Sequence, residues 1–139
     1  MIKEIVRDRD FLSQPSEPAT ADDAEIMQDL LDTYHSMDGD CACLAANQIG
    51  YNKAVVLVDI NGKPMVMFNP KVARGMMSYV TTEGCMSLDD ETEVKRYQII
   101  TVEYEELHEG KLVPRKRKLT EWVAEAAQHG IDHTKGILI

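Results

Sequence analysis

Two histidines near the C-terminus have the spacing of a metal-binding pair. His129 and His133 lie four residues apart in the segment AAQHGIDHTKG, and residues four apart on a helix project from the same face. Their imidazoles can therefore bind one ion, as in zinc hydrolases, where a glutamate follows the first histidine. Here that residue is Gly130. Because the pair alone also fits two ordinary surface or core histidines, a metal site needs a third ligand.

Two further segments supply residues that could complete such a site. The first, TTEGCMSLDD, contains Cys85; a thiolate with two imidazoles suits a divalent transition metal and leaves a fourth position open. The second, CACLAANQIG, ends a run of small residues with Gln48, whose side-chain amide can donate to a developing oxyanion. The alternatives are a small buried core residue for Cys85 and a surface turn for Gln48.

The composition indicates one acidic domain. The chain has 139 residues, of which 44% are hydrophobic, enough for a single domain over residues 1–139 but not for two. The net charge of −9 disfavours nucleic acids and anionic membranes as partners, and no apolar run could cross a bilayer. Since the N-terminus lacks a secretory signal and three cysteines make no disulfide framework, we expect a cytoplasmic protein.

Hydrophobic patterning predicts a helix, several strands and a second helix. Apolar residues recur at helical spacing after Thr20 and again after Thr120, whereas the segments between them are rich in β-branched residues. In chain order the expected elements are a short strand at 2–6, a helix from Thr20 to Gly39, strands at 54–60, 64–70, 98–104 and 111–119, and a helix from Thr120 to Gly136 with Trp122 in the core. Pro114 predicts an edge position for the last strand. The short connections favour antiparallel pairing, and hence an α+β fold.

Together, the three chemical segments resemble the peptide deformylase family. The family motif Gly-x-Gly-hydrophobic-Ala-Ala-x-Gln corresponds to residues 41–48, and Glu-Gly-Cys-hydrophobic-Ser matches residues 83–87 in full. The motif His-Glu-x-Asp-His corresponds to residues 129–133, but lacks the glutamate. The resemblance covers nearly the whole chain. It implies an α+β fold in which antiparallel sheets pack around a C-terminal metal-binding helix.

The resemblance also implies a reaction, which is removal of the formyl group from N-formyl-methionyl nascent peptides. One divalent metal ion, Fe²⁺ with Zn²⁺ or Ni²⁺ as substitutes, would be held by Cys85, His129 and His133. Gln48 and the backbone N–H of Met86 would bind the formyl oxygen. Asp132 would orient a ligating histidine. The residues expected along the bound peptide are Cys43, Leu44, Glu83, Gly84 and Arg96.

Gly130 is the main departure from the family. The missing glutamate would move the proton during hydrolysis, a contribution of about 10² to 10⁴-fold to the rate. Gly130 is either an engineered change, a natural loss, or compensated by another carboxylate such as Glu83 or Asp132. We therefore expect strongly reduced deformylase activity. The alternative is a catalytically silent homologue that binds metal or formyl-peptide in a sensor or storage role.

Three other features leave alternatives open. Cys41 and Cys43 stand where the family has glycines. They either narrow the cleft, fill a turn as two small residues, or join Cys85 and the histidines in a closed structural or storage zinc site or in a redox-sensitive one. The basic run at 115–118 either touches ribosomal RNA during a transient ribosome contact or is a solvated edge strand. The chain ends six residues after His133, which predicts that a further C-terminal element is absent or has been removed.

Overall fold

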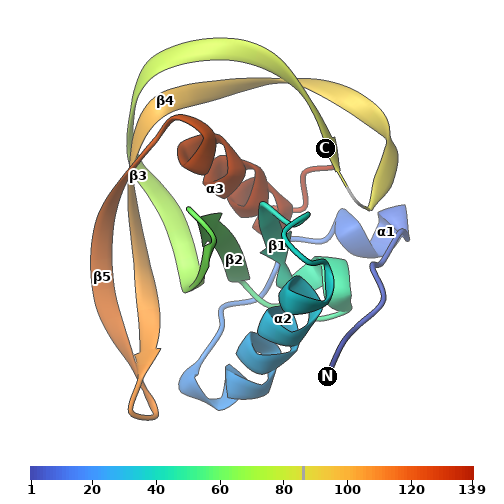
Figure 1. Cartoon of the computed structure of the whole chain (residues 1–139), viewed down its shortest axis with the longest axis vertical. Helices are drawn as coiled ribbons and strands as arrows, with labels where there is room; N and C mark the ends of the chain where they lie inside the picture. Colours follow the sequence, from blue (N-terminus) through green and yellow to red (C-terminus); the bar gives the residue numbers. More distant parts are fainter. Residues whose placement is uncertain (86) are drawn as a thin grey trace.

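The computed structural model of the chain describes residues 1–85 and 87–139. Helical elements predominate in the first part of the chain and consecutive strands in the second, and the C-terminal helix lies within the curve of the longest strands (Figure 1). The helical elements are α1 (Arg9–Leu12), η1 (Ala21–Asp23), α2 (Ala24–Ser36), η2 (Ala46–Ile49) and α3 (Glu121–Thr134). The strands are β1 (Cys43–Ala45), β2 (Val55–Ile60), β3 (Lys63–Cys85), β4 (Leu88–His108) and β5 (Lys111–Thr120).

The strands form one antiparallel sheet in the order β1-β2-β3-β4-β5. The β3–β4 ribbon runs from the Phe68–Glu105 pair to the Cys85–Leu88 pair, and its register shifts at three places. Such bulges bend a strand and increase its twist, so the ribbon can curve around α3 (Figure 1). The predicted α+β class and the C-terminal helix surrounded by antiparallel strands are confirmed.

The core has two parts because β2 is covered on both faces. Val55 and Leu57 pack with α2, whereas Val56 and Val58 pack with α3, as expected when successive side chains point to opposite faces. A strand buried on both sides reads as a continuous apolar run, which explains the segment AVVLVDI. Buried side chains of β1, β2 and α3 therefore share one part of the core, which holds α3 against these strands.

Polar side chains attach α3 to its neighbours. The Gln128 amide donates to the Tyr97 carbonyl at 2.9 Å and accepts from the Tyr97 N–H at 2.9 Å, so it pairs with β4 almost as a strand would. At the other end, Asn47 Nδ2 donates to the His133 carbonyl at 2.9 Å. Buried amides satisfied in this way fix position more sharply than apolar packing alone.

Some expected boundaries were wrong. Residues 2–6 form no described strand; instead the Val6 N–H donates to the Gln48 carbonyl at 2.7 Å. The first long helix has the predicted capping box between Thr20 and Asp23, but it ends at Ser36 rather than Gly39. Trp122 is 64% exposed and not part of the core, because α3 turns this side chain toward an open cavity.

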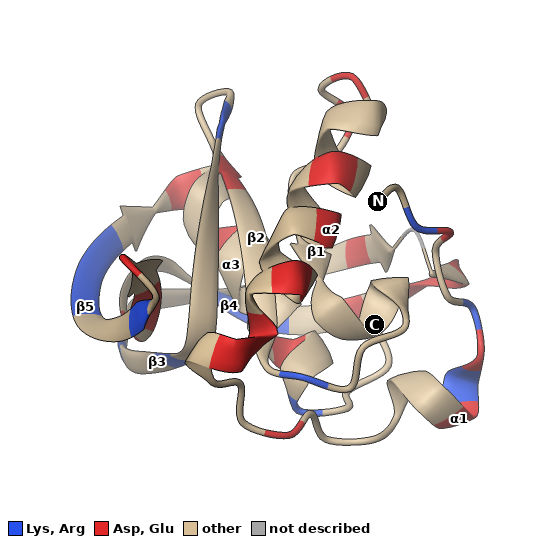
Figure 2. Cartoon of the chain, turned by 90° about the horizontal axis from the view of Figure 1, so that it is seen from below, with Lys and Arg blue, Asp and Glu red and all other residues tan. Residues whose placement is uncertain are grey.

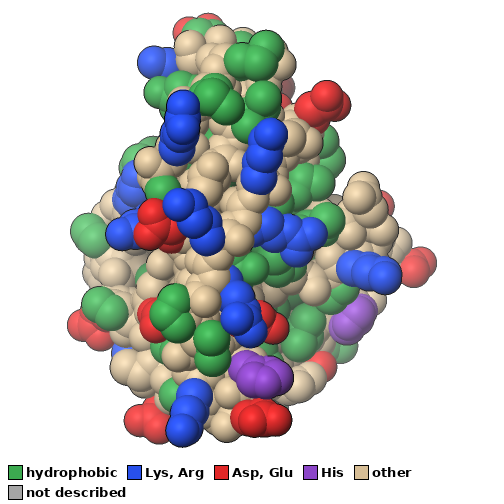
Figure 3. All heavy atoms as spheres, turned by 90° about the vertical axis from the view of Figure 1, so that its left-hand side faces the viewer, with side chains coloured by type: hydrophobic (Ala, Val, Ile, Leu, Met, Phe, Trp, Pro, Cys, Tyr) green, Lys and Arg blue, Asp and Glu red, His purple; other side chains and the backbone are tan. Residues whose placement is uncertain are grey.

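Pro114 lies in the edge strand β5, as predicted. The basic side chains of this strand are exposed, and they stand out as a blue segment in Figure 2, whereas α2 carries mainly acidic ones. Figure 3 faces the side of the molecule on which β5 lies in Figure 1, and Lys and Arg side chains gather there. Among the described residues, no helix is both long and apolar enough to span a membrane.

Candidate metal centre

Cys85 at the end of β3 meets His129 and His133 from α3. Cys85 Sγ lies 3.3 Å from His133 Nε2, which lies 3.0 Å from His129 Nε2. The three potential ligand atoms are all within 4.8 Å of one another. The structure thus brings together the three residues that the sequence predicts as ligands. Within the described part of the chain, neither Cys41 nor Cys43 joins this group, so the closed zinc site gains no support.

Glu83 orients the first of the two histidines. Its Oε1 lies 2.8 Å from His129 Nδ1, and because the pKa of this carboxyl is low, the imidazole is the donor. Burial alone would raise that pKa, but hydrogen bonds from His129 and Arg96 lower it to about 2. Because Nδ1 is engaged as a donor to Glu83, Nε2 is the nitrogen directed toward Cys85 and His133, and it is the atom that would ligate a metal ion.

Arg96 holds Glu83 in turn. Arg96 Nε and Nη2 donate to the two Glu83 oxygens at 2.9 and 2.7 Å, and Nη1 donates to Asp132 Oδ2 at 2.6 Å. Arg96 is only 3% exposed and is not among the residues that line the cavity. Its contacts are therefore with the carboxylates behind the histidines. Glu83, and not Asp132, makes the histidine contact that was expected of Asp132.

The three candidate ligands are electrostatically matched. Burial raises the pKa of the Cys85 thiol, but hydrogen bonds with His129 and His133 outweigh it and lower the pKa to about 5. Burial lowers the pKa of His129, whereas Cys85 and Glu83 raise it to about 9. A thiolate faces two imidazole nitrogens that point at one locus, and a divalent transition metal has the charge and ligand preference for this donor set.

Gln48 is held beside the thiolate by its own local turn. The Ala45 N–H donates to Gln48 Oε1 at 2.9 Å, which directs the amide nitrogen toward Cys85 Sγ and Ser87 Oγ, both at 3.3 Å. The side chain is buried, yet it lines the cavity. Gln48 is therefore placed as a donor next to the candidate ligands. The other predicted donor, the Met86 N–H, lies outside the described residues.

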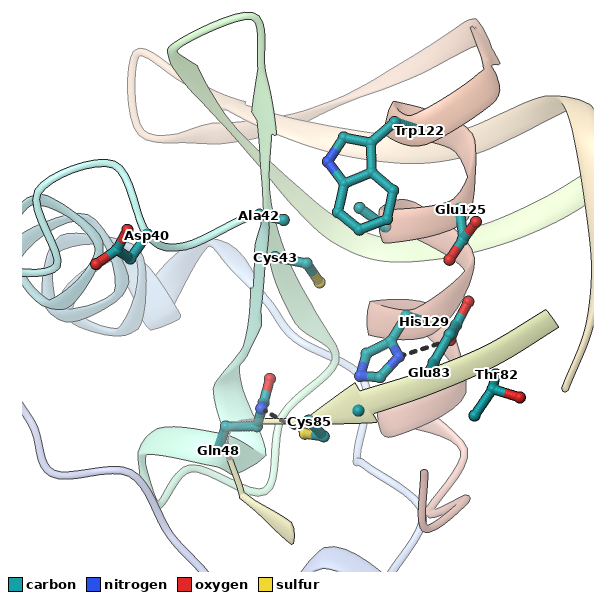
Figure 4. A pocket seen from close by; sticks show the side chains of 12 residues that line it. Asp40, Ala42, Cys43, Gln48, Thr82, Glu83, Cys85, Trp122, Glu125 and His129 are labelled. Atoms are coloured by element: carbon teal, nitrogen blue, oxygen red, sulfur yellow. Dashed lines mark hydrogen bonds and ion pairs between the residues drawn. The ribbon is translucent and has the colours of Figure 1, made fainter. Parts of the chain in front are cut away.

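A cavity of about 280 Å³ opens in front of these residues (Figure 4). Of the residues expected along a bound peptide, Cys43, Glu83 and Gly84 line it, whereas Leu44 is fully buried in the core. The full lining consists of Asp40, Ala42, Cys43, Gln48, Thr82, Glu83, Gly84, Cys85, Trp122, Glu125, Ala126 and His129. Burial raises the pKa of Cys43, so its thiol is neutral.

Sequence reasoning missed six residues of the cavity wall, and the two with the largest polar or aromatic side chains on α3 are Trp122 and Glu125. Trp122 and Glu125 lie on α3 on the same side as His129 (Figure 4). Glu125 Oε1 accepts a hydrogen bond from the Tyr79 hydroxyl at 2.8 Å, and burial and the nearby Glu83 raise its pKa. The signal was present in the spacing, since Glu125 and His129 are four residues apart.

Comparison with known proteins gives a consistent result. A family model described as polypeptide deformylase matches residues 2–139. A peptide deformylase of Clostridium beijerinckii is 37% identical over 139 residues, which cover 100% of both chains. The crystal structure of a peptide deformylase from Legionella pneumophila superposes with a TM-score of 0.86 at 27% identity, covering 99% of this chain and 83% of that one. A peptide deformylase from Synechococcus elongatus, solved with actinonin, has a TM-score of 0.81 at 31% identity, covering 98% and 74% of the two chains.

Proposed function

Because the chain belongs to the polypeptide deformylase family, we propose that it hydrolyses the N-formyl amide of formyl-methionyl peptides, and that it does so slowly. The observation that carries this proposal is the convergence of Cys85, His129 and His133 at the cavity that Gln48 also lines. These three residues would hold one divalent ion, with Fe²⁺ the expected metal and Zn²⁺ or Ni²⁺ accepted by the same donors.

The protein's own groups have separable roles in this proposal. When bound, the ion would polarise the formyl carbonyl and lower the pKa of a water molecule toward neutrality. Gln48 Nε2 would donate to the formyl oxygen as negative charge develops on it, and the Ala45 N–H keeps that amide from turning away. Glu83 keeps His129 in the tautomer that can ligate. The cavity would receive the residue that carries the formyl group.

The step without a dedicated residue is proton transfer. Gly130 has no side chain, and the two carboxylates behind the histidines, Glu83 and Asp132, are both engaged by Arg96. Neither is free to accept a proton from water in the cavity, and Glu125 on the cavity wall already accepts a hydrogen bond from the Tyr79 hydroxyl. A general base contributes about 10² to 10⁴-fold to the rate of hydrolysis, so we expect a rate reduced by that order.

The absence of a general base at position 130 also favours a second candidate function, in which the site binds metal and formyl-peptide without turnover.

The test is deformylation of formyl-Met-Ala-Ser by the iron- or nickel-loaded protein. We expect slow but metal-dependent release of formate. His133→Ala should abolish it, because a ligand is lost, and Gln48→Leu should lower the rate by about 10² to 10³-fold, because the oxyanion donor is lost. Gln14→Leu, an exposed residue, is the matched control and should leave the rate unchanged.

The outcome separates the two candidate functions. Metal-dependent release that falls in Gln48→Leu supports slow hydrolysis. Stoichiometric metal and saturable peptide binding with no formate support the silent homologue. No binding and no formate contradict both.

A further inference from the structure

Position 130 is closely packed against two strands of the sheet. A Cβ atom added to Gly130 would lie 2.5 Å from Cys43 Sγ and 2.6 Å from Val56 Cγ1. Carbon and sulfur atoms that are not bonded to each other do not approach so closely, so any side chain at this position requires the neighbours to move. The two contacts come from different strands, Cys43 from β1 and Val56 from β2.

The neighbours have little freedom to move. Val56 is fully buried, and a β-branched side chain in a strand has a restricted χ1 angle. Helix α3 cannot simply shift outward, because Gln128 is hydrogen-bonded to the Tyr97 backbone and Asn47 to the His133 carbonyl. Of the two obstructing atoms, Cys43 Sγ is the nearer and the one that faces the cavity.

We infer that Cys43, together with Val56, excludes any side chain from position 130, so that the Cys43 thiol and not a carboxylate occupies the cavity wall at this position. The packing at position 130 does not depend on the proposed function. The catalytic consequence of that packing rests on the proposed function and deepens it. The absence of a base at position 130 is then a consequence of how α3 packs on β1, and it depends on both Gly130 and Cys43. A single substitution at Gly130 cannot reverse it.

The packing part of the inference is tested without any assay of activity. Gly130→Ala is made in the wild-type and in the Cys43→Ala background, and the Tm of the nickel-loaded proteins is measured. Alanine is a far better helix former than glycine, so helix propensity alone would raise Tm. We expect Gly130→Ala to lower it by about 4 to 10 °C instead. In the Cys43→Ala background, Gly130→Ala should lower Tm by no more than half as much, because Cys43 Sγ is gone and Val56 is the remaining obstacle to a Cβ atom at position 130.

Gly84→Ala is the matched control. A Cβ atom there would meet only Glu91 Cγ, at 4.0 Å, so Tm should stay within about 2 °C of the wild type. The inference is overturned if Gly130→Ala raises Tm. It is also overturned if Gly130→Ala lowers Tm equally in the wild-type and Cys43→Ala backgrounds. If Gly130→Ala does not fold alone, addition of Cys43→Ala must restore a cooperative transition, and an equally unfolded double variant overturns the inference.

The catalytic consequence is tested with glutamate. Gly130→Glu alone should gain little deformylation of formyl-Met-Ala-Ser, whereas Cys43→Ala/Gly130→Glu should exceed it by at least about 10-fold. Equal rates in the two variants contradict the catalytic part. The remaining outcome is that no variant releases formate, while the effect of Gly130→Ala on Tm still depends on Cys43. The proposed function then fails and the packing inference stands.

Discussion

Arg96 supports the candidate metal centre from behind, through two carboxylates on different elements. Its guanidinium contacts Glu83 on β3 and Asp132 on α3. Removal of this cation by Arg96→Leu would leave the half-buried Asp132 without its counter-charge and the buried Glu83 with His129 as its remaining partner. We expect the free energy of unfolding to fall by about 3 to 5 kcal/mol, as measured by urea denaturation of the metal-loaded protein.

The matched control is Arg115→Leu, which removes an arginine from a half-exposed pair with Glu106. An exposed pair contributes less than about 1 kcal/mol, so this variant should unfold close to the wild-type midpoint. If both variants lose the same stability, the buried network is not the source of the effect. The free energy of unfolding of Arg96→Lys should lie between those of Arg96→Leu and Arg115→Leu. An ammonium keeps the charge but cannot bind both oxygens of Glu83 side by side.

Of the candidate metal ligands, Glu83 contacts His129, through the Nδ1 atom. Glu83→Gln keeps the size of the side chain but removes the charge that fixes the imidazole tautomer. We expect metal affinity to fall by about 10- to 100-fold, measured by competition with a chromophoric chelator. Glu93→Gln, an exposed position on β4, is the control and should bind metal as the wild type does. Unchanged affinity in Glu83→Gln would show that His129 is oriented by other contacts.

At the scale of elements, the sequence indicated α3 and β2 because each carries a one-sided or fully apolar pattern. It did not indicate that β3 continues over residues 71–85 or that β4 already begins at Leu88. Much of that ribbon, including Thr82, Glu91 and Glu93, is exposed, so hydrophobic periodicity is weak there. The ribbon is specified by backbone pairing across the sheet, a long-range property that a local pattern does not record.

The parts of the site that could be predicted are those that depend on local sequence. The ligand spacing lies within one helix and one short motif, so Cys85, His129 and His133 were identified correctly as neighbours. The contact between Cys43 and position 130 depends on how closely α3 approaches β1, and the exposure of Trp122 depends on where the cavity opens. Both are properties of packing between elements, which a motif cannot contain.

The edge strand β5 gives a prediction at this scale. Its basic run at 115–118 is exposed, and among the described strands β5 pairs with β4 alone. Charged side chains, lysine above all, keep such edges from pairing with other chains. Lys116→Ile/Lys118→Ile should therefore associate in a concentration-dependent manner in sedimentation velocity experiments.

The control for the edge variant adds the same apolar surface elsewhere. Lys71→Ile/Lys135→Ile changes two exposed residues outside β5 and should remain as dispersed as the wild type. Association of both variants to the same extent would assign the effect to general hydrophobicity and not to the sheet edge.

At the scale of the whole molecule, the candidate ligands connect the sheet to the helix that it surrounds. Cys85 ends β3, whereas His129 and His133 lie on α3. A bound ion would therefore oppose separation of the two layers, and an ion that binds the folded state stabilises it by mass action, by about 2.7 kcal/mol at 100 times the Kd. Addition of Ni²⁺ to the metal-free protein should raise Tm by about 5 to 10 °C.

Two histidine variants show whether the ion acts through this junction. His133→Ala removes a buried ligand from α3, and the metal-dependent rise in Tm should disappear with it. His108→Ala changes an exposed histidine at the end of β4 and should keep the full rise. Retention of the rise in His133→Ala would place the stabilising ion elsewhere on the chain. In that case the convergence of the three donors would be a feature of packing alone, and the hydrolase mechanism would lose its basis.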